Sequence, residues 1–155
     1  MCNYKIAFYK GKKPGSGLMT SVFRFLDSAT RVLTKGPYSH CELVEVLPTG
    51  EYKCFSSSYR DGGVRSKILS LNQESWDFVS ADFVRLETLQ KVENSTVGQS
   101  YDLLGAMGLV FLTPQSQKRW FCSELVAEVI GLPESWRYTP NTLYSVCKRL
   151  EQGND

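Results

Sequence analysis

The sequence predicts an α+β fold in which a central group of antiparallel strands packs against helices. Residues 38–69 are rich in β-forming side chains and are divided by turn residues, whereas residues 20–34 and 120–131 repeat apolar side chains at helical spacing. Strands and helices do not alternate along the chain, so a parallel sheet built from strand–helix–strand units is not expected. With 155 residues, the chain is long enough to form one domain, spanning residues 1–155, without metal or disulfide support.

Composition and charge exclude several classes of protein. The net charge of +2, from 18 basic and 16 acidic residues, is too small to predict nucleic-acid binding. The five cysteines are odd in number and form no CxxC pair, which argues against a disulfide framework or a zinc ribbon. The N-terminus lacks the layout of a signal peptide, so a reducing, cytoplasmic location with free thiols is expected.

The N-terminal part of the chain is expected to form a strand and then a helix. Residues 4–9 alternate weakly between apolar and polar side chains, and the turn-forming residues 10–17 end this strand. Thr20 or Ser21 caps a helix that runs to about Thr34. The apolar side chains expected to form its buried stripe are Val22, Phe25, Leu26, Ala29 and Leu33.

Short strands are expected in the middle of the chain. Residues 38–47 and 52–58 flank the turn residues Pro48-Thr49-Gly50-Glu51 and so predict a hairpin. Residues 64–69 predict a third strand. Residues 76–86 contain further β-rich pieces, at 78–79 and 82–86.

Helices are expected towards the C-terminus. Residues 89–100 are polar and predict a helix or a loop, whereas the apolar, glycine-containing residues 101–109 predict a buried helix. The apolar run 103–112 is shorter than the roughly 20 residues that cross a bilayer. Burial of this run is favoured over contact with a membrane. Residues 139–141, with Pro140 at the first helical position, begin a final helix that runs to about Leu150.

Residues 120–131 contain the strongest chemical feature, a cysteine at the start of a helix. Apolar side chains recur at helical spacing after Cys122, with Glu124 and Glu128 on the opposite face, and Gly131 ends the helix. The partial positive charge of a helix N-terminus favours a thiolate over a thiol. Cys122 is therefore a candidate nucleophile. The alternative is a small buried residue of the core.

A cysteine nucleophile requires a base, a group that orients the base, and donors for the developing oxyanion. His40 is the one histidine of the chain, and Glu42 lies two residues later, on the same face of the expected strand. Unpaired N–H groups of the first helical turn, including that of Cys122, are candidate oxyanion donors. The alternatives are a surface histidine and an exposed strand glutamate, which leave the site without catalytic function.

Other combinations of residues are weaker. His40 and Cys41 point to opposite faces of a strand and so cannot easily share a metal ion, and neither a metal nor a cofactor is predicted. Cys41 and Cys54 are expected to face each other across the hairpin, as packing and not as a disulfide.

Two segments together resemble the sequence motifs of NlpC-type papain-like cysteine peptidases. They are residues 98–106, Gly-Gln-Ser-Tyr-Asp-Leu-Leu-Gly-Ala, and residues 120–126, Trp-Phe-Cys-Ser-Glu-Leu-Val. The histidine segment, residues 38–44, precedes the cysteine here. This order resembles the circularly permuted branch, which is related to the lecithin–retinol acyltransferase-like proteins. The resemblance covers roughly residues 36 to 145 and implies a papain-like fold.

The resemblance also implies roles for single residues. It makes Cys122 the nucleophile, His40 the general base and Tyr101 a tyrosine whose hydroxyl lines the oxyanion site. The alternative for Tyr101 is a buried, hydrogen-bonded helix tyrosine. Family members often carry a polar orienting residue on the next strand, where this chain has Phe55-Ser56-Ser57-Ser58. Glu42 is the preferred orienting residue on physical grounds, and Ser56 is the alternative.

These inferences predict a thiol hydrolase that forms an acyl-enzyme at Cys122 and cleaves a peptide or isopeptide amide. Peptidoglycan peptides are the habitual substrate of the wider family, but the absence of a signal peptide weakens that choice. Two alternatives stay open. One is an acyltransferase or thioesterase acting on lipid or thioester substrates, which predicts an apolar groove beside Cys122. The other is an inactive binding module on the same fold.

Overall fold

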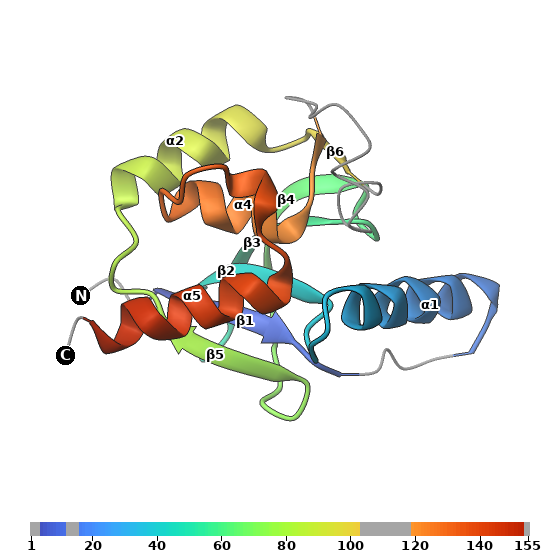
Figure 1. Cartoon of the computed structure of the whole chain (residues 1–155). Coiled ribbons are helices and arrows are strands. Elements are labelled where there is room, and N and C mark those ends of the chain that lie inside the picture. The colour runs from blue at the N-terminus through green and yellow to red at the C-terminus, as the bar shows by residue number, and fades with distance from the viewer. Residues whose placement is uncertain (1–3, 12–15, 103–118, 154–155) are drawn as a thin grey trace.

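The computed structural model describes residues 4–11, 16–102 and 119–153 (Figure 1). Its strands are β1 (Tyr4–Tyr9), β2 (His40–Val46), β3 (Tyr52–Ser58), β4 (Gly63–Leu69), β5 (Trp76–Ser80), β6 (Ser100–Tyr101) and β7 (Arg119–Trp120). Its helices are α1 (Leu18–Leu33), α2 (Leu86–Thr96), α4 (Cys122–Val129), the 3-10 helix η2 (Ser135–Arg137) and α5 (Pro140–Gln152). The fold is thus mixed α+β, as the sequence predicts.

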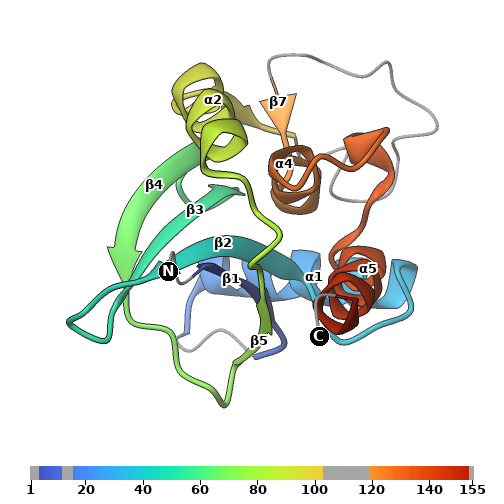
Figure 2. The same cartoon turned by 90° about the vertical axis from the view of Figure 1, so that its left-hand side faces the viewer.

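Within these described ranges, the strands form one curled sheet in the order β5-β1-β2-β3-β4-β6-β7. The neighbouring strands from β5 to β6 pair antiparallel, and only the short β6–β7 pair is parallel. Helix α4 packs on β2 and β3, while α5 packs on β1 and β5 (Figure 2). The cysteine helix therefore lies against the strand that begins with His40.

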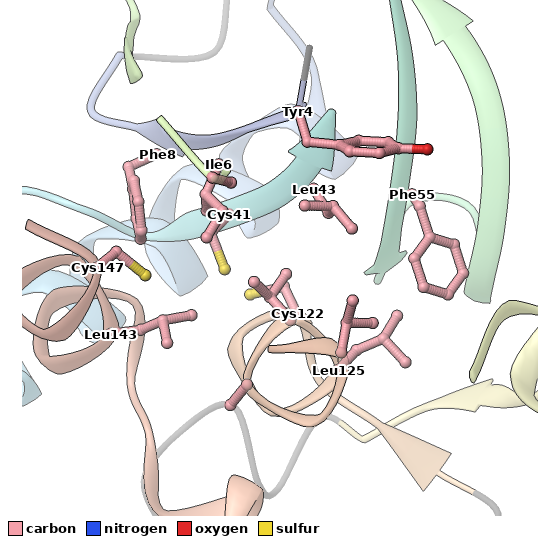
Figure 3. Packing of buried hydrophobic residues seen from close by; sticks show 14 of the residues in the cluster. Tyr4, Ile6, Phe8, Cys41, Leu43, Phe55, Cys122, Leu125, Leu143 and Cys147 are labelled. Carbon is pink, nitrogen blue, oxygen red and sulfur yellow. The ribbon is translucent and has the colours of Figure 1, made fainter. Parts of the chain in front are cut away.

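The main core fills the space between the sheet and these helices. Side chains that alternate along the strands face it, among them Ile6, Phe8, Cys41, Leu43 and Phe55, and they meet Cys122, Leu125, Leu143 and Cys147 of the helices (Figure 3). A smaller cluster around Ala7, Val44 and Cys54 lies on the other face of the sheet. The two-residue period of the strands thus separates two environments.

Helix α1 differs most from the sequence-based prediction. Its predicted buried stripe is wrong at three of five positions, because Phe25 is 70% exposed, Leu33 is 60% exposed and Val22 is 38% exposed, whereas Leu26 and Ala29 are partly buried. The helix stands beside the sheet and not over the main core (Figure 1). The residues that it turns inward to line a cavity are Phe23, Leu26, Asp27 and Thr30, of which only Leu26 was predicted to be buried. It begins at Leu18, two residues before the predicted cap at Thr20.

Several predicted boundaries are confirmed and others are wrong. Strand β1, the hairpin β2–β3, strand β4 and the start of α5 agree with the sequence analysis, as does the end of α4, where Gly131 has a φ of 75°. The β-rich piece at 82–86 forms no strand; α2 begins at Leu86 instead. Glu124, predicted on the polar face of α4, is only 3% exposed, because α2 and α5 also pack against that helix.

None of the helices in the described ranges is both long enough and apolar enough to cross a bilayer. The predicted apolar run 103–112 lies outside the described residues.

Candidate functional site

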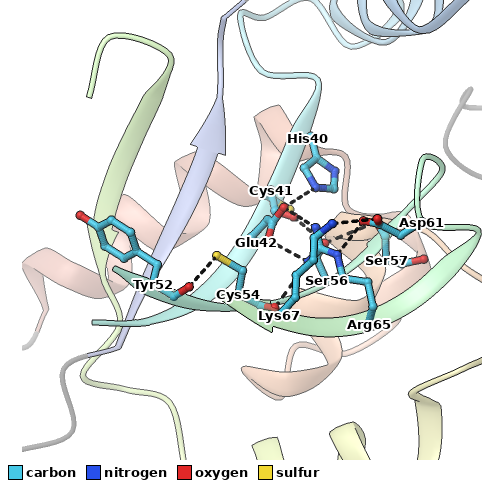
Figure 4. A network of polar contacts seen from close by, with 10 residues as sticks. All are labelled: His40, Cys41, Glu42, Tyr52, Cys54, Ser56, Ser57, Asp61, Arg65 and Lys67. Carbon is cyan, nitrogen blue, oxygen red and sulfur yellow. Dashed lines mark hydrogen bonds and ion pairs between the residues drawn. The ribbon is translucent and has the colours of Figure 1, made fainter. Parts of the chain in front are cut away.

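The first residues of β2 place an imidazole beside a buried carboxylate. His40 and Glu42 are two residues apart on the strand and share a face, as the sequence analysis expects. The His40 Nε2 atom lies 3.1 Å from the Glu42 Oε1 atom (Figure 4). Glu42 is only 2% exposed, so this hydrogen bond fixes the ring from the protein interior. The alternative of an exposed strand glutamate is wrong.

Arg65 of β4 holds the same carboxylate from the other side. Its two terminal nitrogens, Nη1 and Nη2, donate to the Glu42 oxygens Oε2 and Oε1 over 2.9 and 2.7 Å. Its Nε atom donates to Asp61 over 2.8 Å, and Lys67 donates to the other Asp61 oxygen over 2.8 Å. Burial by itself raises the pKa of Glu42, but its hydrogen bonds with His40 and Arg65 lower that pKa to about 2. Glu42 is therefore a fixed negative charge at neutral pH.

Cys122 is the first residue of α4 and lies beneath the surface, at 3% exposure. The Cys41 thiol donates a hydrogen bond to its sulfur, and the backbone of Cys41 contributes another. These bonds, together with the charge and hydrogen bond of His40, outweigh burial and hold the pKa of Cys122 well below its usual value. The site thus favours a thiolate at Cys122.

The pKa of His40 shifts in the complementary direction. Burial lowers it, but the neighbouring Cys122 sulfur and then the Glu42 carboxylate raise it to about 9. A lowered cysteine pKa and a raised histidine pKa describe a thiolate–imidazolium ion pair at neutral pH. This pair is the most distinctive electrostatic feature of the site.

The backbone of Cys41 makes different contacts from the rest of β2. In the described sheet, β2 pairs with β3 only from Leu43 to Val46. Before Leu43, the Cys41 carbonyl accepts a hydrogen bond from the Ser56 hydroxyl over 2.7 Å, and the Cys41 backbone bonds to Cys122. Cys122 thus contacts the start of β2, where both Cys41 and His40 lie.

Ser56, the alternative orienting residue, has a structural task. It is fully buried, and its hydroxyl donates to backbone carbonyl groups of Cys41 and Ser57. The imidazole is bonded by Glu42 instead. Of the two candidates, Glu42 is the one placed to orient His40.

Tyr101 lies at the end of the short strand β6, so the predicted helix starting at this residue is wrong there; residues 103–109 lie outside the described chain. Its backbone N–H donates to the Gly62 carbonyl over 3.2 Å. Gly63 permits this approach, because a Cβ atom at that position would lie 1.9 Å from the Gln99 carbonyl oxygen. Burial, and then the charge of Cys122, raise the pKa of Tyr101, so its hydroxyl stays protonated and able to donate.

A cavity of about 350 Å³ opens beside His40, Glu42 and Tyr101. Apolar and aromatic side chains from α1, from the strands and from the loops after β3 and β4 line it, among them Tyr9, Phe23, Leu26, Tyr59, Leu69, Leu71 and Trp76. Three basic residues, Arg60, Arg65 and Lys67, and three acidic residues, Asp27, Glu42 and Asp61, also line it. Arg65 and Lys67 are paired with Glu42 and Asp61. Cys122, which is 3% exposed, is not among its lining residues.

Three residues that shape this site were not predicted from the sequence. Arg65 was expected only as part of the third predicted strand, residues 64–69. It reaches Glu42 of β2 across the intervening strand β3, so the pair becomes visible only when the order of these strands is known. Asn141 of α5 binds the turn before His40, accepting from the Tyr38 N–H over 3.0 Å and donating to the Tyr38 carbonyl over 2.9 Å. Cys41 is the third. No local sequence pattern indicates its contact with Cys122.

The predicted pairing of Cys41 with Cys54 is wrong. Cys54 is opposite Val44 in the hairpin register and belongs to the cluster on the other face of the sheet, whereas Cys41 faces α4. Among the described residues, no group of three or more histidine, cysteine or acidic side chains is arranged to hold a metal ion.

A comparison of the chain with protein-family models, with curated proteins and with solved structures found no match in any of the three.

Proposed function

We propose that the protein is a thiol hydrolase of the papain-like, permuted NlpC type that cleaves an amide bond through an acyl-enzyme at Cys122. The observation that carries the proposal is the arrangement of three side chains: His40 contacts Cys122, the first residue of α4, and its Nε2 atom lies 3.1 Å from the buried Glu42 carboxylate. The directions of the pKa shifts of Cys122 and His40 agree with it. A low cysteine pKa beside an oriented, protonated histidine is the arrangement that activates a thiol nucleophile.

Each group has a defined task in this reaction. The Cys122 thiolate attacks the substrate carbonyl carbon, and the Tyr101 hydroxyl with N–H groups of the first turn of α4 stabilises the oxyanion. The His40 imidazolium donates its proton to the leaving amine. The neutral imidazole then removes a proton from water, which attacks the acyl-enzyme and releases Cys122. Glu42 keeps the ring oriented and stabilises its positive charge.

The side chains that line the cavity favour particular classes of substrate. Its aromatic and aliphatic walls suit an extended acyl or peptidyl side chain. A peptide or isopeptide amide is our first choice of substrate. The apolar lining gives specific support to the second, a lipid ester or a thioester cleaved or transferred through the same Cys122 intermediate.

The buried position of Cys122 favours a competing function, an inactive module that binds ligands in the cavity. Attack on a substrate requires a carbonyl group to reach this buried sulfur. The two functions therefore differ in whether Cys122 reacts in the folded protein.

Limiting iodoacetamide at neutral pH, followed by mass spectrometry of the cysteine peptides, tests the proposal. Hydrolase function predicts that Cys122 of the folded protein is alkylated before Cys54 and Cys147, whose pKa values burial raises to about 12. His40→Ala removes this preference. Equal, slow labelling of all three buried cysteines would support the binding module. Incubation with a peptide p-nitroanilide and with a fatty-acyl thioester then distinguishes the substrate classes by the acyl adduct trapped on Cys122.

A further inference from the structure

Cys41 and Cys122 form a pair of thiols inside the core. Cys41 lies on β2 and is fully buried; Cys122 lies at the start of α4. Their sulfur atoms point toward one another, with no side chain drawn between them (Figure 3). They are far apart in the sequence, so the packing of α4 on β2 creates the pair.

The environment makes the two thiols chemically unequal. Burial raises the pKa of Cys41, and the nearby Cys122 raises it further, so Cys41 stays a thiol. Cys122 accepts its hydrogen bond and is the more nucleophilic sulfur. One reactive thiolate beside one protonated thiol is the arrangement found where an oxidised cysteine has a second cysteine to resolve it.

We propose that Cys41 and Cys122 form a reversible intramolecular disulfide when the protein meets a hydroperoxide, with Cys122 as the oxidised residue and Cys41 as the resolving residue. The two roles follow from the difference between the thiols: Cys122 is the more nucleophilic sulfur, and Cys41 is the protonated neighbour that contacts it. Cys54 lies on the other face of the sheet. Cys147 projects from α5, and in Figure 3 the Cys41 sulfur is drawn nearer to the Cys122 sulfur than to that of Cys147.

The chemistry balances in two steps. The Cys122 thiolate attacks one peroxide oxygen, the O–O bond breaks and an S–O bond forms; the His40 imidazolium protonates the departing hydroxide to water. The Cys41 sulfur then attacks the sulfur of the Cys122 sulfenic acid, the S–O bond breaks, and the hydroxyl leaves with the Cys41 proton as a second water. Two thiol sulfurs are oxidised and one hydroperoxide is reduced.

This inference does not require Cys122 to attack an acyl substrate. If the hydrolase function holds, the disulfide removes the nucleophile and switches the enzyme off until a thiol reductant restores it. It also protects Cys122 from irreversible oxidation to sulfinic acid. The proposed disulfide would join β2 to α4 at the place where the helix packs on the strand.

Peptide mapping after oxidation tests the proposal. The folded protein is treated with stoichiometric hydrogen peroxide, and the reaction is then quenched with an alkylating agent. The expected product is a peptide pair that joins Cys41 to Cys122, with a loss of two hydrogens from the intact mass that dithiothreitol reverses. Cys147→Ser is the matched control, because it removes another buried thiol of the same core, and it should leave the product unchanged. Cys41→Ser should instead yield a Cys122 sulfenic acid that dimedone traps.

The proposal is overturned if the wild-type protein accumulates sulfinic acid on Cys122 while Cys41 remains alkylatable after denaturation, or if Cys41 joins a different cysteine. The wild-type product decides the matter even if Cys41→Ser fails to fold. Failure of the disulfide leaves the iodoacetamide result intact, so it is distinguishable from failure of the hydrolase proposal.

Discussion

The two faces of β2 bury ionisable groups with opposite results. On the core face, Cys41 is fully buried and burial raises its pKa, so it remains neutral. On the cavity face, Glu42 is 2% exposed, yet its pKa falls to about 2 because Arg65 and His40 bind it. Partner groups, and not the degree of burial, decide which group is charged. Cys122 lies in the main core with Cys41 and is buried like it, but its pKa is lowered, as that of Glu42 is.

Removing the negative charge of Glu42, on the cavity face of β2, should change the free energy of unfolding more than any other substitution considered. Glu42→Gln leaves the Arg65 guanidinium and the imidazolium without their buried carboxylate, and we expect a loss of about 3 kcal/mol in the free energy of unfolding at neutral pH. Urea denaturation measures it. Glu128→Gln, an exposed substitution on α4, is the control and should change stability by less than about 0.5 kcal/mol.

The loss of stability in Glu42→Gln should depend on pH, and the lowered pKa of Glu42 fixes the direction of this dependence. The folded-state pKa of Glu42, about 2, lies below its ordinary value of 4.5, so its ionisation stabilises the fold above pH 4.5. This contribution is lost as the pH falls from 4.5 through about 2. The stability difference between the wild-type protein and Glu42→Gln should be constant from pH 4.5 up to the range in which His40 titrates, and should narrow below pH 4.5. A difference that widens on acidification contradicts the assignment.

The next largest effect should come from the geometry of the charge pair. Arg65→Lys keeps the positive charge but loses the bidentate contact with Glu42, so we expect a loss of about 1 to 2 kcal/mol in the free energy of unfolding. Arg137→Lys alters an exposed pair with Glu134 and should cost less than about 0.5 kcal/mol. Equal losses in the two variants would mean that burial of the Arg65–Glu42 pair is energetically unimportant.

On the core face, the thiol of Cys41 should have a smaller effect on Cys122. Cys41→Ala removes one hydrogen bond to the thiolate, worth about 1 kcal/mol, and should raise the pKa of Cys122 by a little under one unit. Cys41→Ser retains a hydroxyl donor and should keep most of the shift. The pH dependence of the iodoacetamide rate at Cys122 measures both. A greater rise in Cys41→Ser than in Cys41→Ala contradicts the hydrogen-bond account.

Tyr101→Phe should have the smallest effect on the resting site. The neutral hydroxyl changes the alkylation rate of Cys122 by less than about twofold, but its loss should slow turnover of an amide or thioester by about tenfold or more if it binds the oxyanion. Tyr59→Phe, which alters another cavity-lining tyrosine, is the matched control. An unchanged turnover rate would assign Tyr101 a packing role.

The sequence predicted the parts of this site that depend on local periodicity. The two-residue spacing of His40 and Glu42, and the helix start at Cys122, follow from strand and helix geometry. The contact of Cys41 with Cys122 and the clamp of Asn141 on the turn at Tyr38 join distant segments, so no local pattern reveals them. Helix α1 shows the same limit: its period was recognised, but tertiary packing turned Phe23, and not Phe25, toward the cavity.

The most direct test of the ion pair is the thiolate absorbance of Cys122 in the ultraviolet, taken as the difference between the wild-type protein and Cys122→Ser across a pH titration. Thiolate absorbance should appear well below the usual thiol pKa of about 8.5 and should already be present at neutral pH, with His40 remaining protonated until about pH 9. Absorbance that appears only at or above about pH 8.5, with the same midpoint in His40→Ala, would contradict it.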